Sequence, residues 1–136
     1  MNSWGMPQWL EEEVRTRDTA CVYCGIRMIE HVPRRGPRKA AATWEHIIND
    51  ATIVTRENIA RCCAACNSSK GTKSLAEWIE SRYCRMRGIT LDTVAEVVKR
   101  ALWASALAGQ TAVGADRRLH SASETAAAGL RRPLNG

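Results

Sequence analysis

The sequence contains no phenylalanine, only two tyrosines and no long apolar run. A helix that spans a membrane needs about 18 or more consecutive apolar residues, so none is expected here. The N-terminal segment reaches Glu11–Glu13 where a secretory signal would need its apolar region, and we therefore expect a cytoplasmic protein. Because aromatic side chains are few, a core this small would benefit from a metal ion that ties the chain together.

What the sequence does contain is a set of six cysteines, four of which form two Cys-x-x-Cys pairs. The pairs are Cys21 with Cys24 and Cys63 with Cys66. Each pair offers two thiolates from a tight turn, and a zinc ion takes four thiolates in a tetrahedron. With no signal peptide expected, this spacing predicts a structural zinc site in a reducing compartment rather than disulfides. The remaining cysteines, Cys62 and Cys84, are expected to be buried or partly buried thiols.

Basic residues outnumber acidic ones, 20 against 14, which gives a net charge of +6. Such a surface suits a polyanion, and nucleic acid is the usual one for a basic cytosolic domain. Five bases lie in one segment broken by proline and glycine: Arg27, Arg34, Arg35, Arg38 and Lys39. A charge run is often only solvated surface, but this one lies between a zinc knuckle and the next predicted strand, which favours contact with phosphates. His31, in the same segment, is expected to be an ordinary surface histidine.

Periodicity and capping signals predict a small α+β domain over residues 1–108. The expected elements are a helix at 7–17, strands at 40–48 and 51–55 joined by a two-residue turn at Asn49–Asp50, and helices at about 56–69, 74–83 and 91–107. Thr55 and Ser74 are the expected N-caps, and Leu91 is expected on the inward face of the last helix. Residues 109–136 are rich in alanine, glycine and serine and are predicted to form a largely disordered tail.

Around the second knuckle, residues that can bind metal or transfer protons follow one another in this order: Glu45-His46, Asn58, Cys63-x-x-Cys66-Asn67 and Lys70-Gly71. Together with the first knuckle, this order resembles the HNH endonucleases, in the variant whose last motif residue is asparagine. The resemblance covers residues 21–71. It departs from the usual pattern at Glu45, where aspartate is commoner, and at 47–50, where a pair of glycines is often found.

The resemblance implies a zinc-stapled ββα-metal (His-Me finger) module, wrapped by additional helices, that hydrolyses phosphodiester bonds in DNA by nicking or cutting. His46 would be the general base, a role that suits the pKa of imidazole, and Asn58 would orient it. Glu45 and Asn67 would hold a catalytic Mg²⁺ (or Mn²⁺) ion through hard oxygen ligands. Because neighbouring residues of a regular strand face opposite sides, the strand would have to twist or bulge at Glu45 and His46. Short nucleases of this kind resemble those of phage and bacterial mobile elements.

The residues expected to contact nucleic acid are Arg34, Arg35, Arg38, Lys39, Lys70 and Lys73. Lys70 stands three residues after Asn67 and can point at the same phosphate; a solvated lysine near a helix C-terminus is the other reading. Two further alternatives stay open. The chain can be a zinc-ribbon module that binds nucleic acid without cutting it, although such a module has no need of a base and two oxygen ligands. The substrate can also be RNA, because contacts to phosphate do not distinguish the two.

Overall fold

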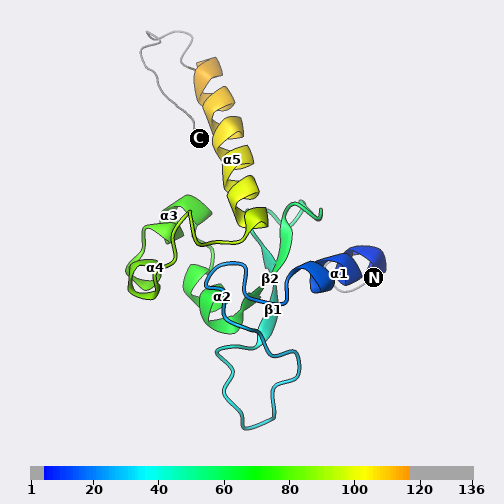
Figure 1. Cartoon of the computed structure of the whole chain (residues 1–136). Coiled ribbons are helices and arrows are strands. Elements are labelled where there is room, and N and C mark those ends of the chain that lie inside the picture. The colour runs from blue at the N-terminus through cyan, green and yellow to red at the C-terminus, as the bar shows by residue number, and fades with distance from the viewer. Residues whose placement is uncertain (1–4, 117–136) are drawn as a thin grey trace. The chain divides into compact units, whose positions relative to one another are not determined.

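The computed structural model describes residues 5–116, with side chains described as far as residue 107. The elements in chain order are α1 (Gln8–Arg17), β1 (Ala42–His46), β2 (Ile59–Cys63), α2 (Ala64–Lys70), α3 (Leu75–Ile79), α4 (Arg82–Arg87) and α5 (Glu96–Asp116) (Figure 1). Residues up to 103 belong to one compact unit, and α5 continues into a second unit that begins at residue 104. The first unit is a small α+β arrangement in which a β-hairpin runs into a helix and further helices follow.

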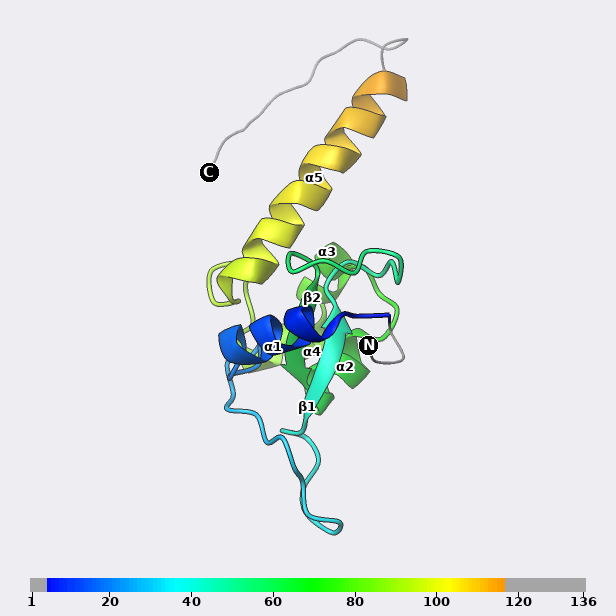
Figure 2. The same ribbon diagram turned by 90° about the vertical axis from the view of Figure 1, so that its right-hand side faces the viewer.

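The hairpin pairs β1 with β2 in antiparallel register, from Ala42 opposite Cys63 to His46 opposite Ile59. Figure 2 shows α1 beside this hairpin. The predicted second strand at 51–55 is wrong, because residues 47–58 form the connection instead. Within it, the Asp50 carboxylate accepts bonds from the amide and the hydroxyl of Thr52, at 3.0 and 2.6 Å. Such local side-chain bonds offer the backbone an alternative to a sheet ladder, so the chain turns here and pairs later.

The helix that follows the hairpin begins at Ala64, not at residue 56 as predicted. The carbonyl of Thr55, the expected N-cap, accepts bonds from the amides of Asn58 and Ile59 in a turn that leads into β2. The true N-cap is Cys63, whose Sγ accepts a bond from the amide of Cys66. α2 is therefore one short helix, attached directly to the end of β2 and ended by Gly71 with a φ of 52°.

The N-terminal helix matches the prediction closely. Its buried residues Leu10 and Val14 pack with Ile59 of β2 in a small apolar cluster. Met6, just before the helix, belongs to the same cluster, and Trp44 lies at its edge. Acidic residues precede basic ones along α1, which favours the helix dipole. This cluster anchors α1 to the hairpin.

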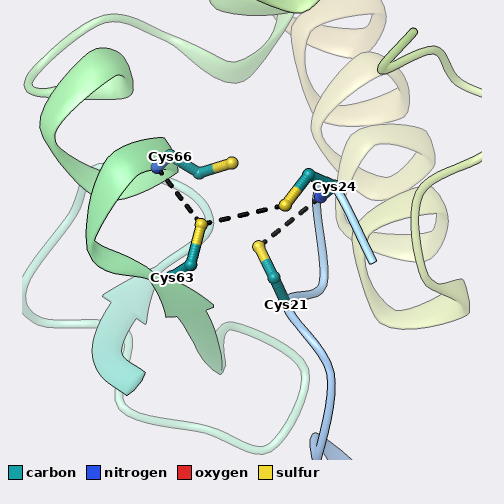
Figure 3. Close-up of side chains that lie close together, drawn as sticks. All are labelled: Cys21, Cys24, Cys63 and Cys66. Carbon is teal, nitrogen blue, oxygen red and sulfur yellow. Dashed lines mark hydrogen bonds between the residues drawn. The ribbon is translucent and has the colours of Figure 1, made fainter. Parts of the chain in front are cut away.

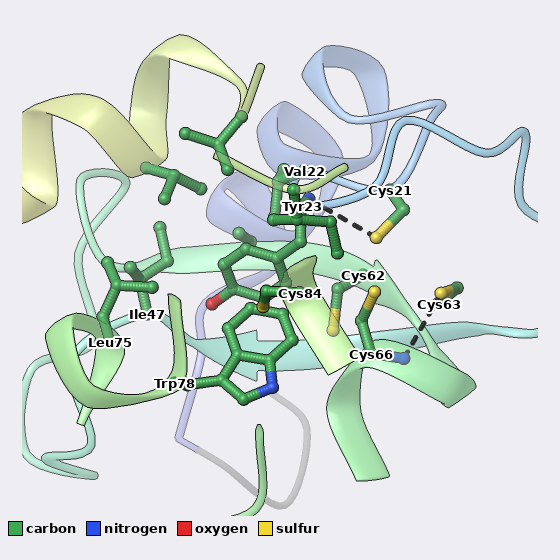
Figure 4. Close-up of a cluster of buried hydrophobic side chains, with 14 of the residues drawn as sticks. Cys21, Val22, Tyr23, Ile47, Cys62, Cys63, Cys66, Leu75, Trp78 and Cys84 are labelled. Carbon is green, nitrogen blue, oxygen red and sulfur yellow. Dashed lines mark hydrogen bonds between the residues drawn. The ribbon is translucent and has the colours of Figure 1, made fainter. Parts of the chain in front are cut away.

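A larger apolar cluster lies between the first knuckle, the hairpin and the later helices (Figure 4). At its centre the rings of Tyr23 and Trp78 meet edge to face, with centroids 4.9 Å apart. Cys62 and Cys84 are both fully buried here, which confirms the expectation of buried thiols. Tyr23 lies between two zinc-type cysteines in the sequence, so the cluster and the cysteine site share one segment.

The region predicted as a helix at 74–83 is divided into α3 and α4. Each begins with a serine cap: Ser74 Oγ accepts from the amide of Glu77 at 3.2 Å, and Ser81 Oγ accepts from the amide of Cys84 at 3.3 Å. Ser74 thus confirms the predicted N-cap. The second cap, at Ser81, starts a new helix where the periodicity alone suggested a continuation.

The last helix begins at Glu96 rather than at residue 91, because Thr90 and Thr93 form a turn before it. Leu91 is 48% exposed, so its predicted inward position is wrong, whereas Val94 and Val98 are buried. Residues 109–116 of the predicted tail belong to α5, and residues 117–136 lie outside the described residues. Within residues 5–116, no helix combines the length and the apolar character that a bilayer crossing requires.

Candidate functional site

The four paired cysteines converge on one point (Figure 3). The sulfur atoms of Cys21, Cys24, Cys63 and Cys66 all lie within 4.8 Å of one another. The Sγ atoms of Cys24 and Cys63 are 3.8 Å apart. Zn–S bonds of about 2.3 Å in a tetrahedron place the sulfurs about 3.8 Å apart, so the cluster fits a structural zinc ion.

Local backbone geometry holds each pair in position. Gly25, with a φ of 79°, turns the chain after Cys24, and its amide bonds to the carbonyl of Cys21 at 2.9 Å. The amides of Tyr23 and Cys24 point at Cys21 Sγ, at 3.4 and 3.5 Å. In the second knuckle the amide of Cys66 points at Cys63 Sγ at 3.4 Å. Such N–H groups stabilise thiolates and orient metal ligands.

The thiols of the cluster influence one another's ionisation. Hydrogen bonds from the thiols of Cys63 and Cys66 lower the pKa of Cys21 to about 2. The same contact with Cys21 raises the pKa of Cys63 to about 11, and it raises that of Cys66 further. Without a metal the site therefore favours one thiolate and holds its neighbours protonated, whereas a zinc ion would stabilise all four thiolates.

Cys62 adjoins the cluster but stays outside it. Its Sγ lies 3.6 Å from Thr43 Oγ1, and burial raises the pKa of its thiol. On the other side of the site, the hydroxyl of Tyr83 donates to Cys66 Sγ at 3.4 Å. The geometry therefore selects Cys63 and Cys66 as the second pair, as the Cys-x-x-Cys register predicted.

Glu45 lies in the interior, where two polar groups contact its carboxylate. Tyr23 donates its hydroxyl to Glu45 Oε2 at 2.6 Å, and the ammonium of Lys70 lies 3.0 Å from the same oxygen. From the sequence, Lys70 was expected to contact a phosphate or to lie in solvent, but its side chain is fully buried. The helix period could have indicated that Lys70 is buried, since Lys70 stands four residues after the buried Cys66 and so lies on the same face of α2.

His46 is the last residue of β1 and keeps its regular pairing with Ile59. A bulge, one of the two distortions expected at Glu45 and His46, is therefore not found, and strand alternation directs the two side chains to opposite faces. Burial lowers the pKa of His46 below its usual value, against the opposing effect of the carboxylates of Glu45 and Asp50. The imidazole is thus neutral at pH 7, in the form that can accept a proton.

Asn67 is docked on the same strand as Glu45. Its side-chain Nδ2 donates to Thr43 Oγ1 at 2.9 Å and to the carbonyl of Trp44 at 3.2 Å. These bonds fix the amide group against the two residues that precede Glu45. Asn67 and Glu45 therefore come from a helix and a strand that are tied together at this point.

Asn58 lies at the end of the hairpin connection, not inside a helix as expected. Its Oδ1 accepts from the amide of Ile48 at 2.7 Å, and its Nδ2 donates to the carbonyls of Ile48 and Ile53 at 3.2 and 3.1 Å. The backbone carbonyl of Asn58 also accepts from the amide of Ile47. One side chain thus clamps both limbs of the connection directly after His46.

Replacing Asn58 with alanine should lower the free energy of unfolding by about 1–3 kcal/mol, because buried backbone groups lose their partners. The amide of Ile48 should also exchange its hydrogen faster. Urea unfolding and hydrogen exchange of the zinc-loaded protein measure the two effects. Glu57→Ala, next to it and exposed, should change stability by less than about 0.5 kcal/mol. Equal effects of the two substitutions would contradict the clamp.

The basic segment between α1 and β1 projects from the rest of the first unit as a long loop (Figure 1). Arg34, Arg35, Arg38 and Lys39 are all exposed, as are Arg27, His31 and Lys73. Two backbone hydrogen bonds hold the end of the loop to α2. The amides of Ala64 and Ala65 at the start of α2 donate to the carbonyls of Ala41 and Lys39, at 2.9 and 3.1 Å. The basic loop is therefore attached to the helix that carries the second knuckle.

A second anchor of this loop was not visible in the sequence. Arg61 of β2 is buried, stacks on the ring of Trp44 at 4.4 Å and pairs with Glu30 at the start of the loop. Arg15 of α1 contacts the same two partners. Arginine is expected on the surface, and only the three-dimensional pairing reveals that these two residues hold the loop to the hairpin.

Comparison of the chain with models of known protein families, with curated proteins and with solved structures found no match. The structure itself shows a four-cysteine cluster that is consistent with zinc, and a β-hairpin that runs into a helix beside it.

Proposed function

We propose that this protein is a metal-dependent endonuclease of the HNH type, which hydrolyses phosphodiester bonds in DNA. The observation that carries the proposal is the meeting of β1 and α2. Glu45 and His46 end the strand, and Asn67 is bonded to the two residues just before Glu45. Because β1 keeps its regular pairing, the side chains of Glu45 and His46 leave the end of the strand on opposite faces, so a phosphate would have to lie across this end to meet both. A cysteine cluster that fits zinc fixes the start of the same helix. This order of groups matches the residues on which the resemblance to HNH enzymes rests.

The donor set suits a hard divalent cation. Glu45 offers a carboxylate and Asn67 an amide oxygen, while both amide hydrogen bonds of Asn67 use the nitrogen. Magnesium takes oxygen ligands, usually one or two from the protein, and leaves the rest to water and phosphate. When bound, such an ion would stabilise negative charge on the phosphate and on the leaving oxygen.

His46 would act as general base. In the proposed reaction a water oxygen forms a bond to phosphorus while His46 takes the proton of that water, and the bond between phosphorus and the 3′-oxygen breaks. The 3′-oxygen takes a proton from solvent, which leaves a 3′-hydroxyl and a 5′-phosphate. Since burial lowers the pKa of His46, the base is available at neutral pH, and activity should fall as pH drops through that pKa.

A second function, a zinc module that binds nucleic acid without cutting it, is favoured by one observation. Glu45 already has two partners in the core, the hydroxyl of Tyr23 and the ammonium of Lys70. These contacts give the carboxylate a structural role that needs no cation. On this reading the basic loop binds phosphates and His46 has no catalytic task.

Nicking of a supercoiled plasmid separates the two functions. The zinc-loaded protein is freed of loosely bound metal and assayed with and without added magnesium, so that zinc stays in place while magnesium varies. The endonuclease proposal expects relaxed plasmid only when magnesium is present. Binding without cleavage would support the zinc module instead. If the same assay with RNA in place of the plasmid shows cleavage of RNA but not of DNA, the substrate would be RNA.

Replacing Arg34, Arg35 and Arg38 together with alanine should weaken DNA binding and flatten its salt dependence while the fold is kept. Each lost phosphate contact should reduce the slope of log K against log salt by about one unit. Titrations at several salt concentrations measure the slope. A variant with Arg82, Lys99 and Arg100 replaced by alanine, all exposed, changes the net charge equally. If both variants flatten the slope alike, the loop has no special role.

A further inference from the structure

Lys70 is a buried lysine that the proposed reaction does not yet use. Its side chain is 1% exposed, and its ammonium contacts the carboxylate of Glu45, itself 8% exposed, at 3.0 Å. Lysine is almost never fully buried unless it is paired. Lys70 therefore acts as a built-in counter-ion for the carboxylate that is the candidate cation ligand.

The ammonium of Lys70 also contacts a residue of the surface. It donates to Asn49 Oδ1 at 3.3 Å, and Asn49 is exposed. Asn49 is itself held in place, because its Nδ2 donates to the carbonyl of Lys73 at 2.6 Å. Lys70 is the last residue of α2, and its long flexible stem can carry the charge outward while the helix stays in place.

We propose that Lys70 is a positioning residue that changes places with the divalent cation. Without a cation its ammonium neutralises Glu45 and holds the carboxylate in the core. When a cation binds to Glu45, the ammonium moves past Asn49 to the surface, where it contacts a phosphate of the DNA. The inference rests on the proposed function, because it takes Glu45 as a cation ligand.

The physical reason is repulsion between positive charges in a poorly solvated site. A carboxylate with one buried ammonium 3.0 Å away is already neutralised, and a divalent cation brought to it meets a like charge at close range. The free protein should therefore bind the cation weakly. DNA favours the exchange, since its phosphates give the displaced ammonium a new partner and the cation further ligands. Lys70 thereby couples cation binding to the presence of substrate.

The test is the affinity of the zinc-loaded protein for Mn²⁺, measured by electron paramagnetic resonance without DNA. Lys70→Met should bind Mn²⁺ at least about tenfold more tightly than the wild type, since one nearby charge changes proton affinity about ten- to a thousandfold. Lys99→Met makes the same change at an exposed site and should leave the affinity unchanged. Equal or weaker binding by Lys70→Met, or no binding by any form, would overturn the proposal.

Because removal of Lys70 leaves Glu45 without its counter-ion, the variant can fail to fold, and a measurement on the wild type decides in that case. The side-chain ammonium of Lys70 is followed by NMR during a magnesium titration. Its signal should move towards that of exposed lysines, with the same midpoint as magnesium binding. An unchanged signal at saturating magnesium overturns the exchange, and plasmid cleavage under those conditions would leave the endonuclease proposal standing. If the signal moves but no DNA is cut, the exchange is supported and the endonuclease proposal is rejected.

Discussion

His46→Ala should lower the single-turnover rate of DNA cleavage by about 100- to 10,000-fold, the usual effect of removing a general base. Zinc content, stability and DNA affinity should stay close to those of the wild type, because the base acts in the chemical step and not in holding the duplex. The rate is measured at saturating protein with magnesium, so that weaker binding cannot imitate slower chemistry.

His31→Ala is the matched control, since His31 is an exposed histidine of the basic loop. It should cleave at close to the wild-type rate. Cleavage by His46→Ala at the wild-type rate would remove the catalytic assignment and leave the binding module as the better account. Loss of cleavage together with loss of zinc or of fold would show a structural role for His46 instead.

Cys63→Ser should abolish both zinc binding and the folded state. Wild-type protein should contain close to one zinc per chain, and the variant close to none. Binding of a structural zinc by small peptides supplies about 10–16 kcal/mol of apparent free energy. A domain of this kind has only about 5–15 kcal/mol of net stability, so the loss of one ligand should unfold it.

Cys62→Ala is the control for the zinc site, because Cys62 is the adjacent buried cysteine and its sulfur lies outside the cluster. It should keep one zinc and a cooperative unfolding transition, with a modest loss of stability. Metal analysis and circular dichroism make both measurements. A well-folded Cys63→Ser variant, or a zinc-free wild type, would contradict the structural role of the site.

Local signals in the sequence predicted the parts of the fold that depend on few residues. The Cys-x-x-Cys spacing identified the four cysteines whose sulfur atoms converge, since each knuckle is a turn that needs no distant partner. The apolar stripe of α1 and the N-cap at Ser74 could also be predicted, because each depends on residues within a turn or two of a helix.

The second strand could not be read in the same way. All five residues of β2 are buried, so the strand shows no alternation of polar and apolar side chains. Its start is fixed by the side chain of Asn58, which accepts a bond from the amide of Ile48 and donates one to the carbonyl of Ile53, ten and five residues earlier in the chain. The β-branched residues at 51–55 therefore suggested a strand that the chain forms only later.

The burial of two charged side chains could not be predicted from the sequence either. Charged side chains such as those of Lys70 and Arg61 are expected in solvent. Each of these two is buried because it forms an ion pair with a carboxylate. These pairs join segments far apart in the sequence. The four-cysteine cluster could thus be predicted from the sequence, whereas the internal pairing of Glu45 could not.

The most direct test of the central claim is the chemistry of the nick made in supercoiled DNA by zinc-loaded wild-type protein with magnesium. Attack of water with departure of the 3′-oxygen leaves a 5′-phosphate beside a 3′-hydroxyl, so DNA ligase should reseal the nick, and without magnesium no nick should form. Plasmid that stays supercoiled with magnesium present, or a nick that ligase cannot seal, would contradict the account.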